Sequence, residues 1–224
     1  MSVTPTPPRA AAAPSSPRRG QTQREGIALL AGIVGLMWIV EVINTLDSNG
    51  LDTDGIYGRS VDHLWGILTT PFIHESFAHL IGNTIPFVFM GFIIALHGAK
   101  RLALVTLIVI VVGGIGTWLV APSNIPTIGA SGVVFGYAGY LFARGFFDRS
   151  ISELLIGLLV GVVWGGALVS SLVPHTGISW QGHLFGALGG VIAASVLRRE
   201  RTAAPGRPPA PGQPPARPAS VPAK

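Results

Sequence analysis

Long runs of hydrophobic residues dominate the chain and are separated by shorter polar stretches. Each run approaches the roughly 20 apolar residues that an α-helix needs to cross the hydrocarbon core of a bilayer. This pattern predicts an all-α, polytopic membrane protein with six transmembrane helices in one bundle. The six predicted spans cover residues 26–46, 77–97, 101–120, 130–147, 152–173 and 179–197.

The composition supports lipid as the surrounding solvent. The mean hydropathy is +0.55, and only 11% of the residues are charged, whereas soluble proteins carry about 25%. The chain has no cysteine, which excludes disulfides, thiol nucleophiles and cysteine-ligated zinc. The net charge of +5 does not indicate a nucleic-acid partner, because the basic residues lie in tails and short loops and form no stripe with aromatic residues.

The two ends of the chain differ from the middle. Residues 1–25 and 198–224 are rich in Pro, Ala and Arg. Because such segments have too little apolar surface to pack, we expect disordered tails on either side of a membrane domain of residues 26–197.

The distribution of Lys and Arg predicts the orientation of the spans. With the N-terminus in the cytoplasm, the outer segments hold a single basic residue, Arg59, out of fifteen Lys and Arg. Cytoplasmic loops are the ones that accumulate basic residues, so both termini are predicted to be cytoplasmic, in a protein of the plasma membrane. The outer segments instead hold the acidic residues Asp47, Asp52, Asp54, Asp62 and Glu75.

The first outer segment, residues 47–76, is too long for a hairpin. It contains Leu64, Trp65 and Phe72, which makes it too apolar for a solvated linker. Long loops without structure are unusual and often functional. We therefore expect short helices here that lie partly in the membrane interface.

Polar residues within a span are costly and mark candidate sites. Ser131 lies in the stretch GASG, after a loop that contains Pro122 and Pro126. A helix from Ser131 to residue 147 is about 25 Å long, less than the hydrocarbon thickness of about 30 Å, so we expect it to begin at the bottom of an outer cavity. There Ser131 suits a nucleophile beside N–H groups that hold an oxyanion; the alternative is a serine that merely caps the helix.

His183 opens the last predicted span, in QGHLFGALGG. Gly186 and Gly190 lie four residues apart on this span, and Gly132 begins a second set of small residues on the serine span. Small residues let two helices approach closely, which would bring His183 within hydrogen-bond reach of Ser131. The alternative is a histidine that bonds a carbonyl group for packing.

His79 and Asn83 stand four residues apart in FAHLIGNTIPF, so they share one helix face. Both suit the stabilisation of an oxyanion; the alternative is a contact between helices worth ~0.6–2 kcal/mol. His74 does not complete a zinc motif with His79, because five residues of helix would place the two side chains about 140° apart. Glu41 is expected to reach the membrane interface.

The motifs HESFAHLIGN, GASG and GHLFGALGG occur in this order on the second, fourth and sixth predicted spans. This set resembles the rhomboid family of intramembrane serine proteases, and the resemblance covers residues 26–197. It implies a catalytic dyad of Ser131 and His183 without an acidic third member. It further implies an oxyanion hole made of His79, Asn83 and the Ser131 backbone N–H.

The resemblance also assigns supporting roles around the dyad. Phe135 stands where the family places an aromatic ring, usually tyrosine, against the histidine. The residues expected to shape and support the site are Gly129, Gly132, Phe135, Gly186 and Gly190.

The resemblance implies hydrolysis of peptide bonds in or near transmembrane segments, without a metal or a cofactor. The expected partners are transmembrane protein substrates and the lipid bilayer, and the oligomeric state stays open. One alternative is a rhomboid-fold protein that binds transmembrane clients without cutting them; loss of Ser131 or His183 would mark it, and both are present. A transporter or channel would more often show paired charges or an internal repeat.

Overall fold

The computed structural model describes residues 19–173 and 177–198. It has six long helices: α1 (Arg19–Leu46), α3 (Phe77–Ala95), α4 (Ala99–Val120), α5 (Ser131–Asp148), α6 (Ile151–Ser170) and α7 (Trp180–Val196). Between α1 and α3 lie one short α-helix and three 3₁₀ helices: η1 (Gly50–Asp54), η2 (Val61–His63), α2 (Gly66–Thr69) and η3 (Thr70–Phe72). The predicted all-helical class is confirmed, and each predicted span coincides with one long helix.

The first helix is longer than the predicted span. The helix α1 begins at Arg19 rather than at residue 26, so residues 19–25 extend the first helix instead of belonging to the tail. Gln21 supports this extra length by donating to the Glu25 carboxylate at 3.2 Å, one turn further on. The remaining parts of the predicted tails, residues 1–18 and 199–224, lie outside the described residues.

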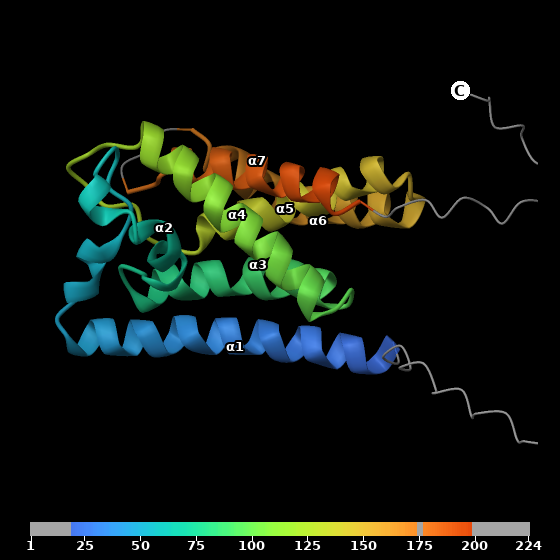
Figure 1. Ribbon diagram of the computed structural model, residues 1–224, viewed down its shortest axis with the longest axis horizontal. Coiled ribbons are helices and arrows are strands. Elements are labelled where there is room, and N and C mark those ends of the chain that lie inside the picture. Colours follow the sequence, from blue (N-terminus) through green and yellow to red (C-terminus); the bar gives the residue numbers. More distant parts are fainter. Residues whose placement is uncertain (1–18, 174–176, 199–224) are drawn as a thin grey trace, which may run out of the picture.

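The long helices form a bundle whose centre is α5. Figure 1 shows α1 and α3 side by side along one edge, with α4 crossing the bundle obliquely and α5, α6 and α7 grouped together. By length and composition, four of the described helices are able to cross a membrane: α1, α3, α4 and α6. Most residues of α5 are buried, because it packs against α3, α4, α6 and α7.

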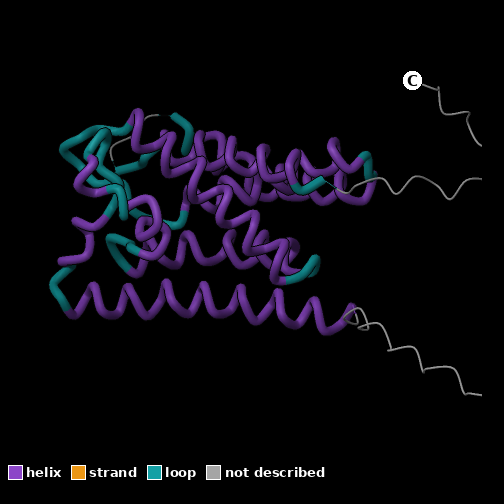
Figure 2. Tube along the Cα trace, viewed as in Figure 1, coloured by secondary structure: helices purple, strands orange, loops and turns teal. Residues whose placement is uncertain are grey.

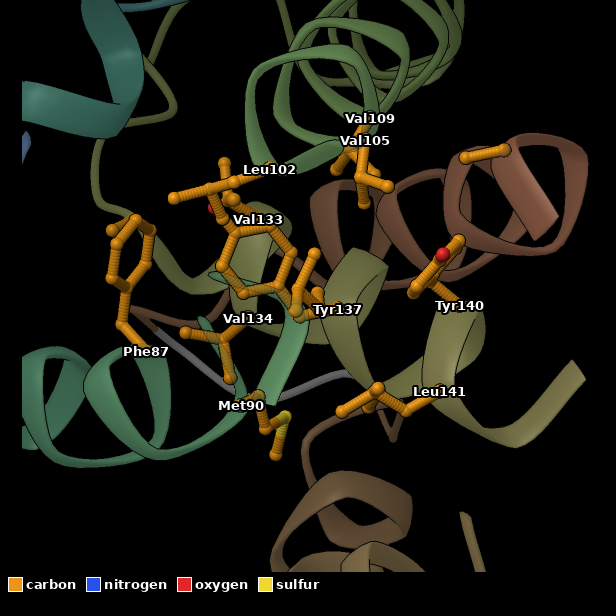
Figure 3. Packing of buried hydrophobic residues seen from close by; sticks show 14 of the residues in the cluster. Phe87, Met90, Leu102, Val105, Val109, Val133, Val134, Tyr137, Tyr140 and Leu141 are labelled. Carbon is orange, nitrogen blue, oxygen red and sulfur yellow. The ribbon is translucent and has the colours of Figure 1, made fainter. Parts of the chain in front are cut away.

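The hydrophobic core is built around α5. Tyr137 is completely buried, its ring centroid lies 5.1 Å from that of Phe87 on α3, and its hydroxyl lies 2.6 Å from Thr106 Oγ1 on α4. A buried tyrosine keeps its stabilising effect only if its hydroxyl finds a partner, and Thr106 supplies it. Figure 3 shows the α3 and α4 side chains that surround this helix: Phe87, Met90, Leu102, Val105 and Val109.

Glycines bring α5 and α7 into backbone contact. A Cβ atom added at Gly186 would lie 2.1 Å from the Gly132 carbonyl oxygen, and one at Gly190 would lie 1.9 Å from the Gly136 carbonyl oxygen. No larger residue fits such an approach. The backbone of α7 is therefore held directly against the first turns of α5.

Buried charged residues connect the end of α5 with the start of α6 and with the turn after α3. Arg144 is 1% exposed; its Nε lies 3.1 Å from an Asp148 oxygen, and a terminal guanidinium nitrogen lies 3.0 Å from a Glu153 oxygen. His97 approaches the same Glu153 oxygen at 3.6 Å. Because a buried guanidinium must be paired, this cluster fixes the end of α5 against the start of α6 and the turn after α3.

Glu41 does not behave as expected from the sequence. The expectation that it reaches the membrane interface is wrong, because its side chain is 0% exposed. It shares a face of α1 with the buried residues Met37 and Asn44, and α1 packs against α3. The helix turns this face toward the protein, so Glu41 is enclosed before it can reach the headgroups.

The segment between α1 and α3 forms short helices, as predicted. Figure 2 shows these helices and their connecting loops gathered at one end of the bundle. This is the end at which α3, α5 and α7 begin. The starts of three helices are therefore brought to one place; the Ser76 and Ser179 side chains cap α3 and α7, whereas no side chain caps α5.

Candidate active site

Ser131 is the first residue of α5 and follows the loop between α4 and α5. The capping position is occupied by Ala130, and no side chain caps this helix. The alternative of a capping serine is therefore wrong, and the hydroxyl is available for another partner. Ser131 is half-buried and lies on the wall of a partly open cavity, whose empty space is about 420 Å³ when the solvent at its mouth is included.

The structure brings Ser131 and His183 together. The Ser131 Oγ lies 2.9 Å from His183 Nε2, across the glycine contact between α5 and α7. On its other side, His183 Nδ1 lies 2.8 Å from the Ser171 carbonyl oxygen. A carbonyl oxygen only accepts, so Nδ1 carries the proton and Nε2 is left as an acceptor for the Ser131 hydroxyl.

Two contacts fix the plane of the His183 ring. Phe135 stacks on it with the ring centroids 4.1 Å apart and the planes parallel. Ser171, the residue that follows α6, holds the ring edge through its backbone carbonyl. Carbonyl groups at a helix end carry negative partial charge, so the Ser171 carbonyl holds the proton on Nδ1 and leaves Nε2 facing Ser131.

Gly129 brings the serine loop against α3. Its φ is +109°, a conformation that residues with a Cβ rarely adopt. A Cβ at this position would lie 2.8 Å from the His79 ring and 3.4 Å from Asn83 Nδ2. The backbone next to Ser131 therefore lies directly beside both predicted oxyanion residues.

Asn83 has an unused donor at this place. Its side chain is 8% exposed, and its Nδ2 has no hydrogen-bond partner among the described residues. Such a buried, unsatisfied donor costs about 1–3 kcal/mol. This finding opposes the alternative that Asn83 joins helices and favours a donor reserved for a ligand.

The segment between α1 and α3 holds the serine loop through its backbone. Thr70 in η3 accepts from the Gly129 N–H at 3.0 Å, and its hydroxyl donates to the Thr127 carbonyl at 3.0 Å. Thr127 and Ile56 exchange two backbone hydrogen bonds of 2.9 and 3.0 Å. Nothing in the sequence pattern singles out Thr70, because a lone threonine in a loop carries no signal of this contact.

His74 contacts the serine loop, a role that the sequence pattern did not indicate. The expectation that His74 and His79 lie about 140° apart on one helix is wrong, because α3 begins at Phe77 and His74 precedes it. The two rings meet edge to face, with centroids 5.2 Å apart. His74 Nε2 accepts the Ala130 N–H at 3.2 Å.

The cavity adjoins the serine. It is lined by α2, η3, the middle of α4, the loop before Ser131, and the first residues of α7. Gly113 and Gly114 form its α4 wall. The site therefore combines an activated hydroxyl, free N–H donors and an adjoining hollow, which is what acyl transfer requires.

We expect Gly129→Ala to slow the reaction of Ser131 with a serine-directed fluorophosphonate by about 10²-fold, the effect of a displacement of about 1 Å at a reacting group. The new Cβ would strain φ and push the loop away from His79. Gly82→Ala is the matched control, because nothing lies within 4 Å of its added Cβ. Equal labelling rates of Ser131 in the two variants would show that the loop is not constrained.

The chain has relatives among known proteins. The sequence profile described as Rhomboid domain matches residues 61–200. An uncharacterized protein of Mycobacterium tuberculosis is 40% identical over 196 residues, which cover 82% of each chain.

Two relatives from Bacillus subtilis carry more specific names. YdcA, provisionally named a rhomboid protease, is 30% identical over 141 residues, or 61% of this chain and 70% of YdcA. Rhomboid protease GluP is 30% identical over 149 residues, which cover 64% of this chain and 28% of GluP.

Proposed function

Because the chain belongs to the rhomboid family of membrane proteins, we propose that it is an intramembrane serine protease with a dyad of Ser131 and His183. The family supports a protease of the rhomboid type. The substrates are peptide bonds in or near transmembrane segments of other membrane proteins. One observation carries the proposal: the 2.9 Å hydrogen bond from Ser131 to an imidazole whose other nitrogen is already held.

In the first half of the reaction, His183 Nε2 takes the hydroxyl proton as Ser131 Oγ attacks the substrate carbonyl carbon. A bond forms between Oγ and carbon, and the carbonyl oxygen becomes an oxyanion. The protonated His183 then gives its proton to the leaving nitrogen as the C–N bond breaks. The result is an acyl-enzyme on Ser131 and a free amine.

The oxyanion is stabilised by donors already in place. The Ser131 N–H belongs to the first turn of α5 and has no acceptor within the helix. Asn83 Nδ2, unpartnered among the described residues, and the neighbouring His79 ring complete the set. Each donor of this kind is worth about 10²–10³-fold in rate.

In the second half, water attacks the acyl carbon and His183 accepts its proton. The C–O bond to Ser131 breaks, and the proton returns to Oγ. The cavity beside Ser131 is a route for water to the acyl group, because it is partly open. No acidic residue is needed, since the Ser171 carbonyl and the Phe135 ring orient the base.

The protein is an integral membrane protein with several apolar helices. We assign all six long helices as spans of the plasma membrane, with both termini and the flanking tails in the cytoplasm and residues 26–197 as the membrane domain. The assignment is supported by Arg24, Lys100 and Arg149 at one end of the bundle and by the mainly acidic segment at the other. The reacting groups then lie near the outer surface.

A cleavage assay tests the proposal. Purified protein in lipid vesicles is incubated with a single-span test substrate that carries a fluorophore on each side of its transmembrane segment. Cleavage by the wild type and none by Ser131→Ala supports the protease. Binding of the substrate without cleavage by the correctly folded wild type contradicts it and favours a client-binding protein.

A further inference from the structure

We infer that His74 is a positioning residue. It fixes the peptide group between Gly129 and Ala130 and thereby helps to aim the Ser131 N–H at the oxyanion. This inference rests on the proposed protease function. The mechanism uses His79 and Asn83 of the motif HESFAHLIGN but assigns no role to His74. Its contacts supply one.

His74 is completely buried, and its Nε2 accepts the Ala130 N–H at 3.2 Å. An imidazole nitrogen that accepts carries no proton, so the ring proton is on Nδ1. Burial and, to a lesser extent, the nearby His79 ring lower the pKa of His74 to about 4. The ring is therefore neutral at neutral pH, and its acceptor is available.

The bond matters because of its place in the loop. The Gly129 N–H is held by the Thr70 carbonyl, and the next N–H, of Ala130, is held by His74. The peptide that carries the Ser131 N–H is held on its other side by α5, because the Ala130 carbonyl accepts from the Val133 and Val134 N–H groups at 2.9 and 3.0 Å. His74 fixes the preceding peptide, so the Ser131 N–H is held from both sides. Glycine tolerates several backbone conformations, so without His74 the peptide between Gly129 and Ala130 has little to keep it from rotating.

His74 is itself held by α1. The Asn44 side chain is 0% exposed and donates to the His74 carbonyl oxygen at 3.1 Å and to Asp52 at 2.8 Å. Its own oxygen accepts the Leu51 N–H at 3.0 Å. A chain of hydrogen bonds thus runs from α1 and the outer segment through His74 to the residue before the serine.

Two substitutions at this position separate positioning from packing. His74→Leu fills the space but offers no acceptor, so the Ala130 N–H is released. His74→Gln offers an oxygen at similar reach to Nε2. We expect His74→Leu to lower kcat by about 10²–10³-fold, the loss of one oxyanion donor, with KM unchanged, and His74→Gln to restore most of kcat.

The measurement is steady-state cleavage of the single-span test substrate by the full chain in vesicles, with thermal unfolding in parallel. A His74→Leu enzyme with wild-type kcat overturns the inference, as does equal impairment of both variants or a change in KM alone. A lower unfolding temperature with unchanged kcat would assign His74 to packing and also overturn it. An inactive wild type would instead refute the protease, and this inference would fall with it.

Discussion

A fluorophosphonate that labels Ser131 of the wild-type protein should react about 10²–10⁴ times more slowly with His183→Gln, the usual contribution of a general base. Glutamine cannot accept the hydroxyl proton at neutral pH, although it is similar in size. The reaction needs no substrate binding, so the labelling rate reports on the Ser131–His183 pair directly. The rate is measured by mass spectrometry of the labelled peptide.

The matched control for this experiment is Ser171→Ala. His183 Nδ1 is held by the backbone carbonyl of Ser171, and the side chain is not part of that bond. The substitution should therefore leave the labelling rate unchanged. Equal labelling of wild type and His183→Gln, or modification of a serine other than Ser131, would contradict the dyad.

The fold could be predicted to a large extent because the membrane simplifies the problem. A bilayer restricts spans to α-helices and closed β-barrels, so apolar runs of about 20 residues mark the helices directly. The start of α1 at Arg19 was missed because residues 19–25 are polar. Polar residues continue a helix beyond the apolar run without a hydropathy signal.

The side chains of the site left a trace in the sequence, whereas its backbone contacts did not. Ser131, His79 and Asn83 stand out because polar residues are rare in apolar helices. The Ser171 carbonyl that holds His183 is a backbone atom, and every residue carries one. His74 was misjudged because the sequence does not show that the chain bends between it and His79.

We expect Gly186→Leu to destabilise the bundle by about 3 kcal/mol, the upper part of the usual range for overpacking. The added Cβ alone would lie 2.1 Å from the Gly132 carbonyl oxygen, so α7 must move away from α5. Gly132 follows Ser131, and this movement therefore separates the Ser131 hydroxyl from His183. Labelling of Ser131 should fall by about 10²–10⁴-fold, because the general base is then out of reach.

Gly161→Leu on α6 separates this effect from the general cost of replacing a glycine. Nothing lies within 4 Å of a Cβ added at Gly161, and replacing glycine within a helix normally stabilises it by about 0.5–1 kcal/mol. The free energy of unfolding in detergent and the rate of Ser131 labelling should therefore match or exceed the wild-type values for Gly161→Leu. Both should fall for Gly186→Leu. If both variants behave alike, the close contact of α5 and α7 does not hold the dyad together. The pairing of serine and histidine would then depend on the loops rather than on the glycines.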